Sequence, residues 1–288
     1  MLWGYANLAK HLGDDQPVYA FNSQSRDGSG EFATIEEMPA QYVKELRTFQ
    51  PQGPYYLGGY CFGGEVAFEM AQQLAATGQR VALLALFNAM PPNSSSEKIS
   101  LAPLWIARFA RNSWHWFRYY CQWTPDQRRT FTERKLRALK KRLGRLWSRN
   151  AAPKVEAEDQ VDLALYSEDQ RRLWDVHLRA SATYHPRPYP GNVTVFRTRT
   201  HPFFSSFDPS FGWSEFARGG VTVKIIPGAH ESILDEPHVR VAAAELNRCL
   251  ELAQREGARH EDVPSPRATE IKMLLSSVLW VLEMTPAV

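Results

Sequence analysis

The sequence predicts an α/β fold in which helices cover a mostly parallel sheet. Short apolar runs alternate with helix-forming segments near both ends of the chain, and the run at 81–87 is apolar throughout. A strand buried on both faces has this continuous apolar character, and parallel strands need helical crossovers between them. With 288 residues, 44% of them apolar, the chain can form one large domain with an insertion.

The expected elements follow one another with recognisable end signals. Strands are predicted at 17–21, 54–57, 81–87, 192–196 and 221–226. The first of these, at 17–21, is expected to be buried. Helices are predicted at 5–12, 34–49, 65–77 and 239–254. Thr34 is the expected N-cap of the second helix, with Glu37 three residues later, and Gly78 ends the third.

The segment between the second strand and the third helix has the pattern of a nucleophile elbow. It consists of Gly58-Gly59-Tyr60-Cys61-Phe62-Gly63-Gly64. An elbow turns sharply from strand to helix and lifts one side chain clear of the sheet, so its neighbours must be small. Cys61 stands where such elbows usually carry serine, which predicts an α/β-hydrolase fold built around a thiol. The backbone N–H of Phe62 is the expected oxyanion donor.

His230 is the expected general base because it follows the last predicted strand. The carboxyl ends of parallel strands gather at one edge of a sheet, so His230 and Cys61 should project at the same rim. His201, which follows the preceding strand, is the rival base.

Two residues compete to orient the imidazole. Asn88 ends the strand after the elbow helix, and Asp208 follows the penultimate strand. A serine nucleophile would require a carboxylate here. A cysteine can instead exist as a thiolate paired with an imidazolium, and an asparagine carbonyl is then sufficient. Both candidates stay open: Asn88 as the third member, and Asp208 as the alternative.

The alternation of strands and helices stops after the third strand. Residues 93–189 contain no convincing strand and are helix-forming sequence rich in Trp and Arg. We therefore expect an α/β core at 1–92 and 190–258, and a helical lid insertion at 93–189. A tail of uncertain structure is expected at 259–288.

Motifs along the whole core form one specific set. They are the elbow segment 53–64 with the following Ala67-Phe68-Glu69-Met70-Ala71, Pro17-Val18-Tyr19-Ala20, Pro91-Pro92, Gly212-Trp213, and Pro227-Gly228-Ala229-His230 with Pro237. Together they resemble the thioesterase domains of nonribosomal peptide and polyketide synthases. The resemblance runs from about Gly4 to Leu252 and is weak through the insertion.

The resemblance implies an α/β-hydrolase that takes an acyl or peptidyl chain from the phosphopantetheine arm of a carrier protein. It implies Cys61 as nucleophile and His230 as base, and the family's usual acid falls at the position of Asn88. Release would follow by hydrolysis or cyclisation, with no cofactor beyond the arm on the partner. The alternative is a truncated, non-catalytic domain that binds carrier protein or acyl chain. A dienelactone-hydrolase-like esterase is disfavoured by the long insertion.

The chain departs from the resembled family before its first helix. Family members carry an early strand there, with a loop that usually gives a second oxyanion donor, whereas this sequence begins at Met1-Leu2-Trp3-Gly4. The fold is therefore expected to lack an N-terminal strand, which would expose neighbouring strand edges. A late start, a fragment or compensation within the fold would each explain this. The apolar stretch from Ile271 to Met284 either covers the gap or has no part in the core.

Charge and cysteine content limit the partners. A net charge of +3 predicts no nucleic-acid binding, and three widely spaced cysteines fit a cytoplasmic protein without disulfides or zinc. No apolar tract is long enough for a transmembrane segment. The segment Arg128 to Arg149 has ten Lys or Arg against one acid, with leucines at helical spacing. It is interpreted as a solvated face, a docking surface for an acidic carrier protein, or a membrane-surface helix.

Overall fold

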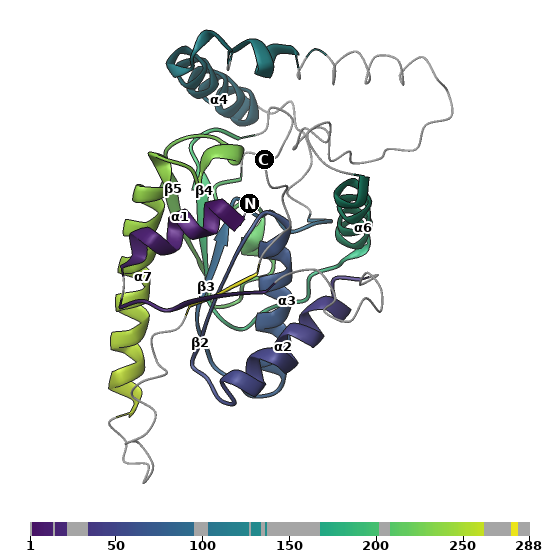
Figure 1. The fold of residues 1–288 in the computed structure, drawn as a ribbon, viewed down its shortest axis with the longest axis vertical. Coiled ribbons are helices and arrows are strands. Elements are labelled where there is room, and N and C mark those ends of the chain that lie inside the picture. The colour runs from purple at the N-terminus through teal and green to yellow at the C-terminus, as the bar shows by residue number, and fades with distance from the viewer. Residues whose placement is uncertain are drawn as a thin grey trace.

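Six strands form one parallel sheet in the part of the chain that the structure describes (Figure 1). This computed structural model describes residues 2–13, 15–21, 34–94, 103–126, 128–133, 136, 168–201, 208–261 and 278–281. The sheet order is β1-β6-β2-β3-β4-β5, and every neighbouring pair is parallel. The strands are β1 (Val18–Phe21), β2 (Tyr55–Tyr60), β3 (Val81–Phe87), β4 (Val193–Thr198), β5 (Val221–Ile226) and β6 (Val278–Val281). The predicted class, a mostly parallel sheet with helices, is confirmed.

Helices cover both faces of this sheet. The helices of the core are α1 (Leu2–Leu12), α2 (Glu37–Phe49), α3 (Phe62–Ala76) and α7 (His238–Glu261). Figure 1 shows α1 and α7 together on one face and α2 and α3 on the other, in agreement with their contacts. α2 begins at Glu37 with Glu36 at the N-cap position, so the prediction of Thr34 as N-cap is wrong, although the Glu37 N–H donates to the Thr34 hydroxyl at 3.2 Å.

The alternation of side chains along β3 explains why its sequence is apolar throughout. Leu84 and Leu86 belong to the core cluster on the side of α2 and α3. Leu83, Ala85 and Phe87 belong to the cluster on the side of α1 and α7. Because successive strand residues point to opposite faces, a sheet covered on both faces needs apolar residues at every position.

The prediction of a buried strand at 17–21 is wrong in one respect. β1 forms at Val18–Phe21, but Tyr19 and Ala20 are exposed. Among the described strands β1 lies at the edge of the sheet and pairs on one side with β6. An edge strand has fewer neighbours to bury its side chains, so apolar character alone did not reveal its position.

The C-terminal tail occupies the sheet position between β1 and β2. β6 pairs in parallel with β1, from Val18 opposite Val278 to Phe21 opposite Val281. It also pairs in parallel with β2, from Tyr56 opposite Val278 to Gly59 opposite Val281. Of the two interpretations of the tail, the one in which it fills a place in the sheet therefore holds for residues 278–281. The first described element of the chain is α1, which packs on α7.

Most of the described part of the segment between β3 and β4 is helical. It contains α4 (Pro103–Gln122) and α6 (Glu168–Thr183), and residues 128–133 continue as helix after α4. Aromatic side chains pack the end of α4 against residues 128–133, with the rings of Trp123 and Phe131 centred 4.8 Å apart. Most of the predicted basic helix at 128–149 lies outside the described residues. The predicted domain boundaries and the role of a lid stay predictions.

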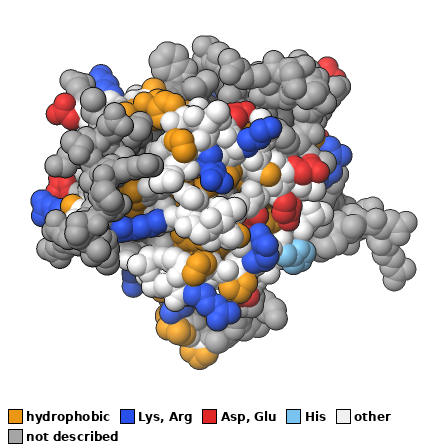
Figure 2. Space-filling view, turned by 90° about the horizontal axis from the view of Figure 1, so that it is seen from below, with side chains coloured by type: hydrophobic (Ala, Val, Ile, Leu, Met, Phe, Trp, Pro, Cys, Tyr) orange, Lys and Arg blue, Asp and Glu red, His pale blue; other side chains and the backbone are white. Residues whose placement is uncertain are grey.

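Two further observations concern the described helices and one face of the molecule. None of the described helices combines the length and the apolar character that crossing a bilayer requires. Figure 2 shows basic and acidic side chains interspersed over the described part of the face seen from below. A mixed surface of this kind does not produce a strong field of one sign.

Candidate active site

Cys61 lies in the turn that joins β2 to α3. Its backbone has φ 53° and ψ −123°, a region that residues other than glycine rarely adopt. The Cys61 N–H donates to the Phe87 carbonyl at 2.9 Å, and the Gly64 N–H donates to the Cys61 carbonyl at 2.9 Å. A strained residue held at a strand-to-helix turn is the geometry of a nucleophile elbow.

Two glycines make this close packing of strand and helix possible. A Cβ on Gly59 would lie 2.0 Å from the carbonyl oxygen of Gly63, and a Cβ on Gly64 would lie 2.3 Å from the Cβ of Ala89. Both distances are far below ordinary contact, so neither position accepts a side chain without movement. The run of small residues in the sequence therefore reflects a steric requirement.

The start of α3 supplies polar groups beside the Cys61 thiol. Phe62 is the first residue of α3, so its N–H is among the four at a helix N-terminus that have no partner within the helix. Such a terminus favours negative charge close to it. Cys61 is partly exposed, whereas Cys249 is buried and Cys121 is exposed on α4, away from the elbow.

His230 lies beside the elbow, in a short 3₁₀ turn (His230–Ser232) after β5. Its ring centroid is 5.0 Å from that of Tyr60, which directly precedes Cys61. The Tyr60 hydroxyl also donates to the His230 carbonyl at 2.9 Å. Burial lowers the pKa of His230 below its ordinary value, although the charge of Glu231 opposes this. The ring is therefore neutral at pH 7 and able to accept a proton.

Hydrogen bonds from two other elements fix the loop that carries His230. The Thr200 hydroxyl, after β4, donates to the Gly228 carbonyl at 3.0 Å. The Ala229 N–H donates to the Ser232 hydroxyl at 3.1 Å, and the Tyr119 hydroxyl of α4 bonds the same oxygen at 2.6 Å. The loop is thus held in place relative to the ends of β4 and α4.

Asn88 lies at the end of β3, one residue beyond the partner of the Cys61 N–H. It is 5% exposed and has φ 44°. Its side-chain oxygen accepts the Thr198 N–H at 2.8 Å and lies 3.3 Å from the Thr198 hydroxyl, which is 2.9 Å from the Thr200 carbonyl. Its Nδ2 is buried and has no hydrogen-bond partner among the described residues. Asn88 is therefore linked through Thr198 and Thr200 to the loop of His230.

Asp208 stabilises its own turn. Its carboxylate accepts the N–H of Ser210 at 3.1 Å and the N–H of Gly212 at 2.7 Å, and the Ser210 hydroxyl also donates to it. Its negative charge opposes the lowering of the pKa of Arg197 and of His201. These interactions are those of a residue that caps a turn close to Arg197 and His201.

The rival base, His201, holds α4 on the sheet. Its backbone N–H donates to Asn112 Oδ1 at 2.8 Å, and its carbonyl accepts from Asn112 Nδ2 at 3.0 Å and from Trp116 Nε1 at 2.6 Å. Its Nε2 accepts a hydrogen bond from Arg197. Burial and the charge of Arg197 lower the pKa of His201 to about 3. An imidazole that faces a guanidinium is poorly suited to take up a proton.

Sequence reasoning did not single out two further groups beside the elbow. His177 of α6 is 3% exposed, and its ring stacks on that of Phe62 at 4.5 Å. Burial lowers the pKa of His177 to about 4. The signal that could have found it is helical spacing, because Trp174, His177 and Ala180 are all buried on one face of α6.

The second missed group is Glu69 of α3, a buried carboxylate that binds the end of α6. Glu69 is 2% exposed and accepts hydrogen bonds from the Tyr184 hydroxyl at 2.7 Å and from Gln72 at 2.8 Å. Arg187 lies 3.3 Å from it. Burial, together with the charge of Glu69, raises the pKa of Tyr184 above its ordinary range. The insertion is thus fastened to the elbow helix at its C-terminal end.

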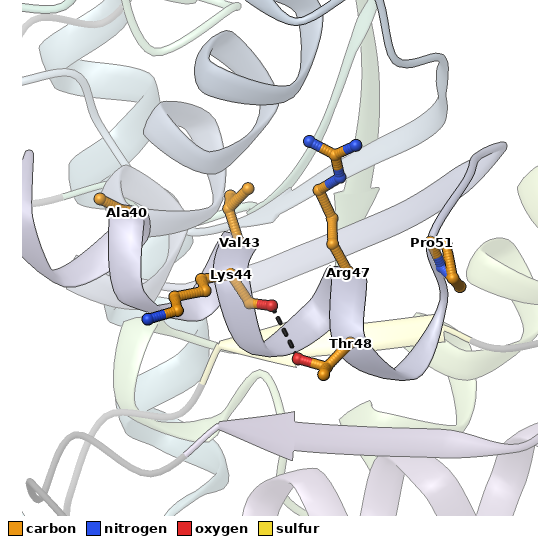
Figure 3. Close-up of a pocket in the computed structure, with 6 residues that line it drawn as sticks. All are labelled: Ala40, Val43, Lys44, Arg47, Thr48 and Pro51. Carbon is orange, nitrogen blue, oxygen red and sulfur yellow. Dashed lines mark hydrogen bonds between the residues drawn. The ribbon is translucent and has the colours of Figure 1, made fainter.

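A surface groove lies apart from these residues, on the outer side of α2 (Figure 3). Its volume is about 520 Å³, and it is lined by Ala40, Val43, Lys44, Arg47, Thr48 and Pro51. The Thr48 hydroxyl donates to the Lys44 carbonyl at 2.9 Å, which satisfies it within the helix. None of the candidate catalytic residues lines this groove. Among the described residues, no group of three or more His, Cys, Asp or Glu is placed to hold a metal ion.

Known proteins similar to this chain are found by sequence. Residues 2–245 match the thioesterase domain family. The chain is 27% identical to atromentin synthetase of Tapinella panuoides over 243 residues, which is 82% of this chain and 24% of the relative. It is 30% identical to the nonribosomal peptide synthetase atqA of Aspergillus terreus over 260 residues, 85% of this chain and 26% of the relative. The chain thus spans about a quarter of these two relatives, and only 2% of the malpibaldin synthetase of Mortierella alpina.

Solved structures agree on the fold. A four-domain nonribosomal peptide synthetase bound to AMP and glycine has a TM-score of 0.52 and 24% identity, over 85% of this chain and 18% of that one. RedJ, with a PEG molecule bound in its active site, has a TM-score of 0.51 and 19% identity, over 86% of this chain and 87% of that one. The expected α/β-hydrolase fold is confirmed. Because the family match extends over most of the 288 residues, this chain belongs to the thioesterase domain family.

Proposed function

We propose that this thioesterase domain releases an acyl or peptidyl chain from the phosphopantetheine arm of a carrier protein, through an acyl-Cys61 intermediate. The observation that supports the proposal is the strained elbow conformation of Cys61, together with the 5.0 Å distance between the ring centroids of His230 and Tyr60, the residue that precedes Cys61. Four of the proteins named above are synthetases of which this chain covers between 2% and 26%, and two of these are named as nonribosomal peptide synthetases. Release of a carrier-bound chain is the reaction that such an assembly requires of a thioesterase.

The proposed reaction has two halves. His230 takes the proton of the Cys61 thiol, and the thiolate attacks the thioester carbonyl carbon. The resulting oxyanion accepts a hydrogen bond from the Phe62 N–H, and the pantetheine thiol leaves with the proton from His230. Water, or an amine or hydroxyl of the chain itself, then gives a proton to His230 and attacks the acyl-Cys61 carbonyl. Cys61 leaves as a thiol, and the chain departs as an acid or a cyclic product.

Asn88 is the proposed third member of the catalytic group with Cys61 and His230, and its proposed role is to help position the loop that carries His230. Its hydrogen bonds to Thr198 connect it to Thr200 and so to the carbonyl of Gly228, two residues before His230. A cysteine nucleophile does not require a carboxylate to support a charged imidazole, so this indirect support suits it. Asp208 is the alternative, and the Asp208→Asn and Asn88→Ala variants distinguish the two by which one lowers the acylation rate.

The proposed partner is an acidic carrier protein, attracted by the basic segment Arg128 to Arg149. In its described part, Arg129 pairs with Glu133 at 2.9 Å, and both side chains are largely exposed. Long-range attraction of this kind is weakened by salt. Carrier affinity that stays constant between low and high ionic strength would contradict this docking surface. The cytoplasm, where its thiols would stay reduced, is the proposed location.

Covalent trapping tests the proposal directly. Purified protein is incubated with an acyl-pantetheine thioester, and intact mass spectrometry should show one added acyl group that disappears in Cys61→Ala. Cys249→Ala is the matched control, because that thiol is buried against α1 and α7 and should leave the adduct unchanged. Release by wild type without any dependence on Cys61 would exclude the acyl-Cys route. Carrier binding without turnover would instead favour a non-catalytic binding domain.

A further inference from the structure

A buried histidine of α6 lies against the elbow. His177 is 3% exposed, and its ring stacks on that of Phe62 with centroids 4.5 Å apart and planes inclined by 12°. Its Nε2 is buried and makes no hydrogen bond within the described part of the chain. Phe62 directly follows Cys61 and carries the proposed oxyanion donor, so this imidazole lies at the edge of the reaction site.

The other residues on the same face of α6 show that His177 lies in a buried part of the helix surface. Trp174 and Ala180, three residues to either side, are buried, and Tyr184 is 1% exposed with its hydroxyl donated to Glu69 at 2.7 Å. A buried polar group that has no partner costs free energy, and an apolar ring would fill the same space without this cost. A polar group retained under these conditions is expected to find its partner in a bound molecule.

The position of His177 is fixed by contacts between the end of α6 and the core. Tyr184, which follows α6, donates its hydroxyl to Glu69 of the elbow helix. Asn93, after β3, donates its Nδ2 to the carbonyls of Ala182 at 3.2 Å and Tyr184 at 2.8 Å, which satisfies the end of α6. The ring is therefore held over Phe62 by the same elements that form the elbow.

The chemistry of this imidazole defines what it recognises. Burial lowers the pKa of His177 to about 4, so at pH 7 the ring is neutral, with one nitrogen that donates and one that accepts. A neutral ring has no charge to pair with a phosphate or a carboxylate, and an alkyl chain offers it no hydrogen-bond partner. A secondary amide offers both an N–H and a carbonyl, and it occurs in peptidyl chains and in the pantetheine arm.

We propose that His177 is a substrate-binding residue that hydrogen-bonds a secondary amide of the acyl chain or of the pantetheine arm. The inference rests on the proposed function, which brings both groups to Cys61. It makes His177 a determinant of which thioesters are accepted.

The kinetic test uses three thioesters and two variants. The thioesters are a peptidyl-pantetheine, an alkanoyl-pantetheine of equal length, and the same peptidyl group on ethanethiol. His177→Phe keeps the ring stack but loses the hydrogen bond, and we expect kcat/KM for the peptidyl-pantetheine to fall about tenfold. His177→Gln keeps a hydrogen-bonding group and should stay within about threefold of wild type. His185→Gln, on an exposed ring, is the control.

The pattern across the substrates identifies the amide. A fall that both peptidyl thioesters share, but not the alkanoyl one, assigns the amide to the acyl chain. A fall that both pantetheine thioesters share, but not the ethanethiol one, assigns it to the arm. Equal falls with all three thioesters are the signature of a packing role and would overturn the inference, as would no fall with any of them.

A binding measurement separates this inference from the proposed reaction. Cys61→Ala protein is titrated calorimetrically with a peptidyl-pantetheine analogue in which a methylene replaces the thioester sulfur. His177→Phe in this background should raise Kd about tenfold. If no thioester acylates Cys61 but the Kd still depends on His177, the release reaction is refuted and the inference stands. If acylation proceeds and the Kd is unchanged, the inference is refuted and the release reaction stands.

Discussion

Gly59→Ala tests whether the elbow depends on backbone packing. The new Cβ would lie 2.0 Å from the carbonyl oxygen of Gly63, 2.2 Å from its carbonyl carbon and 2.6 Å from the nitrogen of Gly64. Ordinary contact between such atoms is about 3.5 Å, so the overlap is roughly 1.5 Å. All three atoms are backbone, so no flexible side chain can move aside. The start of α3 must shift by about 1 Å.

The shift should lower both the free energy of unfolding and the rate at which Cys61 is acylated. Overpacking a core typically costs 1–3 kcal/mol, and we expect about 3 kcal/mol here because the obstacle is backbone. The same movement displaces Cys61 and the Phe62 N–H from the reacting carbonyl. A misplacement of about 1 Å can cost about 100-fold in rate, so acylation of Cys61 should fall by at least that factor.

Gly257→Ala is the matched control for this experiment. Gly257 lies in α7, and a Cβ there would meet no atom within 4 Å. Because glycine weakens a helix interior relative to alanine, the change should stabilise the protein by about 0.5–1 kcal/mol. Urea unfolding and the rate of Cys61 acylation are measured for both variants. A Gly59→Ala protein with an unchanged unfolding midpoint and wild-type acylation would refute the packing argument.

Three further predictions concern the sheet and the buried histidine. Tyr5→Phe removes the hydroxyl that accepts the buried Tyr60 N–H at 2.9 Å. The free energy of unfolding, measured in urea, should therefore fall by about 1–3 kcal/mol. An unchanged free energy of unfolding would contradict this hydrogen bond. Truncation that removes residues 278–281 uncovers the facing edges of β1 and β2, so hydrogen exchange should accelerate at 18–21 and 56–59 but not in β4; unchanged exchange would exclude β6. The folded pKa of His177, about 4, lies below the unfolded value of 6.5, so the unfolded state binds the proton first as pH falls. Stability should therefore fall between pH 6.5 and pH 4 by about 3 kcal/mol more in wild type than in His177→Phe, as measured by urea unfolding at each pH.

The elbow and the elements around it could be predicted because their signals are local. The glycines that flank Cys61 are required by atoms within a few residues of them, such as the Gly63 carbonyl that faces Gly59. β3 begins and ends at the predicted residues because both of its faces are covered, so its whole length is apolar. Such features depend on the chain immediately around them, and a single sequence contains that information.

The features that the sequence did not reveal depend on distant partners. Nothing in residues 278–281 indicates that they pair with both β1 and β2, since an apolar run does not name its neighbours. The hydrogen bond that the Thr198 N–H donates to the Asn88 side-chain oxygen joins the ends of two strands across the whole insertion. Likewise, the place of His177 over Phe62 follows from how Glu69 and Tyr184 fasten α6, which no local pattern specifies.

The place of β6 has a consequence for how the protein folds. In the part of the chain that the structure describes, β1 pairs with β6. The hydrogen bonds between these strands can form only after Val278, the partner of Val18, has been synthesised. Closing so long a loop is entropically unfavourable, and non-local strand pairings of this kind slow folding. On the ribosome, β2 and β3 can pair early, but β1 stays without its ladder until the last described strand has emerged. The nascent chain therefore carries an open strand edge from the emergence of β1 to that of β6, which makes that interval the one in which this domain is most exposed to aggregation.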